Sequence, residues 1–196
     1  MSASEEEVRA LVAAVLAKVS AGEPPVEAGP EERRSPGQTA DVAVGADHGG
    51  FRLKERIAAD LRERGYEVDD CGTTGTDAVD YPDFAHEVAR RVADGTSRWG
   101  IVVDGAGIGS CMAANKVPGI RAATCWDISS ARNSREHNLA NVLVLGAGLV
   151  GESLALEIVK VWLSTPWGGD RHARRVEKIT QIERRYLVGA EAGAMR

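Results

Sequence analysis

From Asp41 onward, short apolar runs alternate with segments in which apolar residues recur periodically. Short apolar runs rich in β-branched residues predict strands at residues 41–46, 67–71, 100–104, 120–125 and 141–146. Between them the apolar residues recur every three or four positions, as at Leu53, Ile57 and Leu61, which predicts helices. Strict alternation of strand and helix implies parallel strands joined by right-handed crossovers. The pattern therefore predicts a doubly wound α/β fold with a sheet of about five strands.

The chain before the first predicted strand follows different patterns. Residues 1–20 open with the capping-box signature of Ser4 and Glu7, which favours an amphipathic helix. One apolar stripe runs along it, formed by Val8, Leu11, Val12, Val15, Leu16 and Val19. Residues 21–40 hold four of the seven prolines and little to bury, which predicts a flexible linker. We expect residues 41–190 to form the one globular domain.

Composition narrows the class of protein. A formal net charge of −5 offers no basic footprint for nucleic acid. No apolar run approaches the ~20 residues that cross a membrane, and the acidic N-terminus is unlike a signal peptide. The three cysteines are scattered without CxxC spacing, which favours reduced thiols and disfavours a zinc site. We expect a cytoplasmic protein without nucleic-acid or membrane partners.

Polar residues concentrate where the predicted strands end. "ADHGG" follows the first strand, "DGAGIGS" the third and "WDISS" the fourth. Ligands bind at the carboxyl ends of the strands in such sheets. The glycines of the second segment allow close approach of backbone, and the following helix directs N–H groups at the loop. NAD binding is not expected, because the GxGxxG pattern is missing after the first strand.

Two histidines and a basic cluster are further candidates. His48 lies in the first loop and His137 just before the fifth strand, where strand-end loops or late helices could converge, so we favour function for both. The arginines at residues 171–175 suit phosphate through forked hydrogen bonds. The same arginines also fit the solvated start of a helix.

Five segments, in order, resemble the type B ribose-5-phosphate isomerases, a family that includes galactose-6-phosphate and allose-6-phosphate isomerases. They are "GADHGGFRLK", "GTTGTDAVDYPDFA", "GIVVDGAGIGSCMAANKVPGIRA", "SREHNLANVLVLG" and "GGDRHARRVEKI", within roughly Asp41 to Glu183. The resemblance implies a Rossmann-like sheet and a homodimer or homotetramer with active sites between subunits. It implies a phosphorylated sugar as substrate and no metal or organic cofactor. The implied reaction interconverts ribose 5-phosphate and ribulose 5-phosphate through an ene-diolate.

The resemblance also implies which residues form the site. Asp104 is expected to be the catalytic base, and His137 is expected to open the sugar ring. The expected substrate-binding residues are Asp47, His48, Tyr81, Gly105, Gly107, Gly109, Asn115, Asn138, Arg171 and Arg175, with the two arginines reaching the phosphate from the neighbouring subunit.

Several positions depart from the family pattern. Many members carry a cysteine base in place of Asp104 and a threonine in place of Ala106, and others use a glutamate at the position of Ser110. An arginine that often helps to hold phosphate is replaced by Gly148. A carboxylate can move the proton, but Asp104 could instead only cap the loop. A hexose-6-phosphate isomerase and a non-catalytic sugar-phosphate-binding subunit with an unlike partner therefore stay open.

The N-terminal helix and linker resemble the encapsulation peptides that direct cargo into bacterial microcompartments. On this resemblance, residues 4–20 would dock on shell proteins and place the enzyme inside the microcompartment. The alternative is an extra helix that packs on its own oligomer. Binding to a membrane surface is disfavoured, because the helix opens with three glutamates, Glu5 to Glu7.

Overall fold

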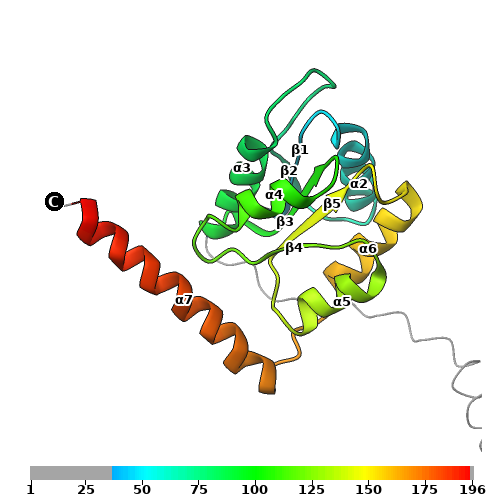
Figure 1. The fold of residues 1–196 in the computed structure, drawn as a ribbon. Coiled ribbons are helices and arrows are strands. Elements are labelled where there is room, and N and C mark those ends of the chain that lie inside the picture. Colours follow the sequence, from blue (N-terminus) through cyan, green and yellow to red (C-terminus); the bar gives the residue numbers. More distant parts are fainter. Residues whose placement is uncertain (1–36, 195–196) are drawn as a thin grey trace, which may run out of the picture. The chain divides into compact units, whose positions relative to one another are not determined.

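A five-stranded parallel sheet in the order β2-β1-β3-β5-β4 forms the centre of the computed structural model, which describes residues 37–194 (Figure 1). The strands are β1 (Ala40–Ala46), β2 (Val68–Asp70), β3 (Ser97–Asp104), β4 (Ala122–Thr124) and β5 (Val142–Gly146). The predicted fold class is confirmed. β3 begins three residues before its predicted start, because Ser97 and Trp99 continue the pairing with β1. The expectations for residues 1–36 lie outside the described residues.

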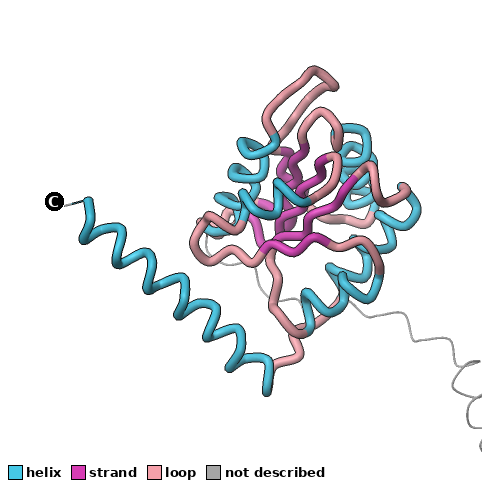
Figure 2. The backbone as a smooth tube through the Cα atoms, in the orientation of Figure 1, coloured by secondary structure: helices cyan, strands magenta, loops and turns pink. Residues whose placement is uncertain are grey.

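Helices cover both faces of the sheet (Figure 2). The covering helices are α2 (Phe51–Glu63), α3 (Tyr81–Ala93), α4 (Ile108–Ala114), α5 (Ile128–Glu136) and α6 (Glu152–Ser164), and a further helix, α7 (Asp170–Ala194), follows them in the chain. One apolar cluster packs α2, α5 and α6 on the first face, and a second packs α3 and α4 on the other. None of these helices combines the length and the apolar character needed to cross a membrane.

The burial of the central strands explains why their sequences are almost entirely apolar. β5 is buried along its whole length, and β1 and β3 are buried over nearly all of theirs. Strands covered on both faces need apolar side chains on both faces, so they do not alternate with polar residues. The helices do show a stripe: Leu53, Ile57 and Leu61 of α2 all face the core, as predicted.

The parallel arrangement gives the sheet two chemically different edges. Each strand ends at the carboxyl edge, and each following helix returns the chain to the amino edge. Residues 100–104 of β3 pair with residues 142–146 of β5, so the two edges lie about 13 Å apart along these strands. Asp47 and Asp104 follow or end strands and lie at the carboxyl edge. His137 follows α5 and lies at the amino edge.

A buried lysine ties the loop after β2 to α2. Lys54 is only 1% exposed, and its Nζ donates to both carboxylate oxygens of Asp70 at 2.8 Å and to the carbonyl of Thr73 at 2.9 Å. Glu55 adds a second carboxylate at 2.7 Å. These contacts compensate the buried charge and hold the start of the loop that leads to Tyr81.

Glycine is required where the loop after β1 crosses the end of β3. A Cβ atom added to Gly50 would lie 2.1 Å from the carbonyl oxygen of Val103, which is backbone and cannot move away cheaply. A Cβ added to Gly105 would meet nothing within 4 Å. Gly105 is therefore a suitable control for Gly50, because a methyl group has room at Gly105 and none at Gly50.

We expect Gly50→Ala to lower the free energy of unfolding by about 2–3 kcal/mol, because the loop after β1 must move away from the end of β3 to make room for the methyl group. Gly105→Ala should change it by less than about 1 kcal/mol. Urea unfolding at one fixed protein concentration checks both values. Equal effects of the two substitutions would contradict the close approach of Gly50 to β3.

Candidate active site

The side chain of Asp104 turns back into the glycine loop that follows β3. It is 4% exposed. Its Oδ1 accepts hydrogen bonds from the N–H groups of Ala106, at 2.8 Å, and Gly107, and its Oδ2 accepts one from Ser110 at 3.1 Å. Successive backbone N–H groups of this kind form an anion-binding concavity. The loop therefore binds the carboxylate of its own chain.

The shape of this loop depends on Gly107. Its φ of 77° is left-handed, and an added Cβ would lie 2.9 Å from Thr124 and 3.1 Å from the N–H group of Gly146. The hydroxyl of Thr124 donates to the carbonyl of Gly107 at 2.7 Å and holds the turn. α4 begins immediately afterwards, so the N–H groups of Ile108 and Gly109 in its first turn have no acceptor within the helix. They are donors that this loop can offer to a ligand.

Other predicted residues lie beside the glycine loop. Asp47 is nearly buried, and its Oδ1 accepts a hydrogen bond of 2.9 Å from the N–H group of Gly50. His48 Nδ1 lies 3.3 Å from both the N–H and the carbonyl of Val79. The ring of Tyr81 covers Gly109, where an added Cβ would lie 2.6 Å from it. We call Asp47, His48, Tyr81 and residues 104–110 the loop site.

A second group of predicted residues gathers at the amino edge. The rings of His137 and His172 stack at 4.1 Å between centroids and 7° between planes. The Nε of Arg171 donates to Nε2 of His172 at 3.3 Å. We call His137, Asn138, Arg171, His172 and Arg175 the histidine cluster. It joins the end of α5 to the start of α7, where Gly168 N–H also donates to the carbonyl of Glu136 at 2.9 Å.

His172 is held as a neutral ring within this cluster. Its burial lowers its pKa, the neighbouring His137, Arg171 and Arg175 lower it further, and the Glu136 carboxylate opposes that shift. The hydrogen bond from Arg171 agrees with this, because Nε2 accepts it only when it carries a lone pair.

The structure does not bring the loop site and the histidine cluster of one chain together. His48 and His137, for which convergence was expected, lie at opposite edges because one follows a strand and the other follows a helix. Asn115 also lies apart from the glycine loop, at the end of α4. Its amide exchanges two hydrogen bonds of 2.9 Å with the backbone of Ala122 and thereby supports the edge strand β4.

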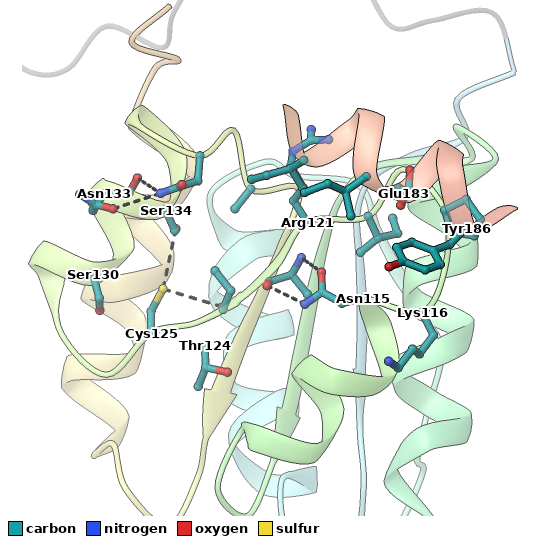
Figure 3. A pocket seen from close by; sticks show the side chains of 18 of the residues that line it. Asn115, Lys116, Arg121, Thr124, Cys125, Ser130, Asn133, Ser134, Glu183 and Tyr186 are labelled. Carbon is teal, nitrogen blue, oxygen red and sulfur yellow. Dashed lines mark hydrogen bonds between the residues drawn. The ribbon is translucent and has the colours of Figure 1, made fainter. Parts of the chain in front are cut away.

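A groove of about 1200 Å³ lies along β4, between α4, α5 and α7 (Figure 3). Asn115, Arg121, Asn133 and Asn138 contribute polar groups to it, and Ile182 and Tyr186 of α7 contribute apolar surface. Sequence reasoning did not single out Asn133 or give His172 a role. Asn133 and His137 are four residues apart on one predicted helix, and this spacing could have indicated that their side chains are neighbours.

The thiols offer no activated nucleophile within residues 37–194. Burial raises the pKa of Cys71 to about 12 and also raises that of Cys125. Cys111 is half-buried and packs with its Sγ 3.3 Å from the carbonyl of Ala122. In the same residues, no three His, Cys, Asp or Glu side chains gather in a way that could hold a metal ion.

Comparison with known proteins identifies the family. Residues 42–179 match the ribose/galactose isomerase family. Over 144 residues the chain is 49% identical to ribose-5-phosphate isomerase B of Escherichia coli K12, covering 74% of this chain and 97% of the relative.

Two solved structures agree. The Clostridium thermocellum ribose-5-phosphate isomerase B is 54% identical with a TM-score of 0.74, covering 74% of this chain and 99% of that one. The Mycoplasma genitalium enzyme with bound ribulose-5-phosphate is 38% identical with a TM-score of 0.72, covering 75% and 98%. The chain therefore belongs to the ribose/galactose isomerase family.

Proposed function

We propose that this protein is an aldose–ketose isomerase that interconverts ribose 5-phosphate and ribulose 5-phosphate. The observation that carries the proposal is the loop site. There the carboxylate of Asp104 is held at the carboxyl end of β3, beside the N–H groups of the first turn of α4. Transfer of a proton through an ene-diolate needs a base and oxyanion donors in this relation. The relative with bound ribulose-5-phosphate supports the choice of substrate.

In the proposed mechanism, Oδ2 of Asp104 is the basic atom. A carboxylate has about four lone-pair positions, and the loop uses two on Oδ1 and one on Oδ2. The remaining one takes the proton from C2 of the open-chain aldose, while the C1 carbonyl oxygen becomes the oxyanion that Ile108 and Gly109 stabilise. The proton returns to C1, and the hydroxyl proton on O2 moves to O1, so the product is the isomeric ketose.

His137 is proposed to open the sugar ring, with Asn138 beside it. The bond from C1 to the ring oxygen breaks, the ring oxygen gains a proton, and the C1 hydroxyl loses one. Arg171 and Arg175 are proposed to hold the phosphate through charge-assisted hydrogen bonds. Asp47, His48 and Tyr81 are proposed to line the sugar site, because they surround the glycine loop.

We further propose that each active site is shared between two copies of the chain, in a homodimer or homotetramer. The loop site and the histidine cluster lie at edges about 13 Å apart in one chain, which exceeds the length of a pentose phosphate. A second copy can present its histidine cluster to the first copy's loop site, as closed symmetry permits. Asn115 lies in the groove along β4 and is proposed as a substrate contact from that side.

The first prediction concerns the base. The protein should convert ribose 5-phosphate in a coupled assay, and Asp104→Asn should lower kcat by about 10²–10⁴-fold while ribose 5-phosphate still binds. Asp104→Cys should keep turnover and become sensitive to iodoacetamide, with the parent protein as the control.

Full activity of Asp104→Asn would show that Asp104 only caps the loop. Binding without turnover in the parent would favour a hexose 6-phosphate or an unlike partner subunit.

The second prediction concerns the shared site. Asp104→Asn and His137→Gln should each be inactive alone, but co-expressed chains should recover about a quarter of the parent activity. This value is expected because half of the dimers are mixed and one of their two sites is intact. Refolding each variant separately before mixing is the control. Absence of recovery in verified mixed oligomers would mean that each chain forms its site alone.

We also propose that residues 4–20 bind shell proteins of a bacterial microcompartment and carry the enzyme into it. The apolar stripe on the expected helix supports this proposal. Deletion of residues 1–38 should leave the oligomer and its activity intact while abolishing co-sedimentation with shell particles. Loss of the oligomer on deletion would instead mean that the segment packs on its own assembly.

A further inference from the structure

A chain of amide hydrogen bonds runs along the end of α5 to the ring of His137. The Nδ2 of Asn138 donates to the backbone carbonyl of Asn133 at 3.3 Å and to its side-chain Oδ1 at 3.1 Å. The Nδ2 of Asn133 lies 2.7 Å from Nδ1 of His137. Figure 3 shows Asn133 on α5 at one end of the groove, with the two hydrogen bonds that it accepts from Asn138 as dashed lines.

The backbone carbonyl determines the direction of every bond in this chain. A carbonyl oxygen only accepts, so the Asn138 group that faces it must be the amide NH₂. That NH₂ also faces Asn133, whose side chain must therefore present its oxygen there. The remaining NH₂ of Asn133 then faces Nδ1 of His137. This orientation follows from the bonding network rather than from visible hydrogens.

The bond from Asn133 determines which ring nitrogen of His137 carries the proton. Because Nδ1 accepts a hydrogen bond, it carries a lone pair, and the proton of the neutral ring lies on Nε2. Nε2 lies 3.9 Å from the carboxylate of Glu136, which is longer than a hydrogen bond. The Nε2–H group is therefore left as the donor that a bound molecule can use.

The backbone beside the ring is equally constrained. Leu139, two residues after His137, has a φ of 50°, a left-handed conformation that costs a non-glycine residue energy. Its carbonyl accepts from Nε of Arg121 at 2.9 Å, and the carbonyl of Ala140 accepts from Arg135 at 2.6 Å. The stacked ring of His172 limits rotation of the imidazole.

We propose that Asn133 is a positioning residue for His137: it holds the neutral imidazole as the Nε2–H tautomer, so that the ring presents one proton donor to the substrate. This deepens the proposed isomerase function and rests on it for the role of His137. Arg171, Arg175 and the carboxylate of Glu136 are the charged neighbours of the stacked rings, but the contact of Nδ1 is with Asn133, so the tautomer depends on Asn133.

The tautomer can be measured without turnover. Long-range ¹H–¹⁵N spectra of the full-length protein distinguish protonated from unprotonated ring nitrogens, and His137→Gln assigns the signals. We expect the parent protein to carry the His137 proton on Nε2. Asn133→Leu should give a mixture of tautomers, and Asn133→Asp should place a proton on Nδ1, because a carboxylate only accepts. A parent ring protonated on Nδ1 would overturn the proposal.

Kinetics test the consequence. Asn133→Leu should lower kcat on ribose 5-phosphate about tenfold, the effect of one lost hydrogen bond, with KM within about twofold. Asn133→Asp should lower kcat further, because the wrong tautomer removes the donor. The matched control is Ser129→Ala, one turn earlier on α5 in the same groove, which should keep the parent kcat.

The outcomes separate this inference from the proposed function. Parent kcat in Asn133→Leu, with the protein folded, would overturn the positioning role, as would an unchanged tautomer in that variant. If the parent does not isomerise ribose 5-phosphate, the proposed function fails on that substrate. The ¹⁵N spectra would then still decide whether Asn133 sets the tautomer of His137.

Discussion

Parallel pairing of all five strands is the constraint on which the placement of every functional residue depends. In such a sheet, residues that follow strands gather at one edge, and residues that follow helices gather at the other. Asp47, His48 and Asp104 belong to the first group, whereas His137 and Arg171 belong to the second. This separation is the reason why we propose that the substrate binds between two chains.

The charge of Asp104 changes what the glycine loop can do. Backbone N–H groups that could face a ligand anion are used by a carboxylate of the same chain. A neutral thiol at this position would leave those donors available, so an aspartate here changes the anion site as well as the group that we propose as the base. Donors left to a substrate include those of Ile108 and Gly109, which are positioned by the start of α4.

Part of the site was visible in the sequence because its residues are close together along the chain. The glycine loop and the Asp47–His48 pair directly follow apolar strands, and such short-range patterns indicate both the element and its polar end. Tyr81 is different: its ring lies over Gly109 only because β2 and β3 flank β1 in the sheet. The bonds of Asn115 to the backbone of Ala122 are also tertiary, because they join the end of α4 to the edge strand β4.

The sequence by itself determined the strands, the helices, the parallel fold and the family, because periodicity and local motifs depend on neighbouring residues. Only the tertiary structure decided where the carboxylate of Asp104 points, which ring stacks on His137, and which groups lie at opposite edges of the sheet. They depend on hydrogen bonds and packing that the local pattern does not determine, as between His137 and His172, which lie 35 residues apart in the chain. Such contacts form only after the sheet has set the positions of its loops and helix ends.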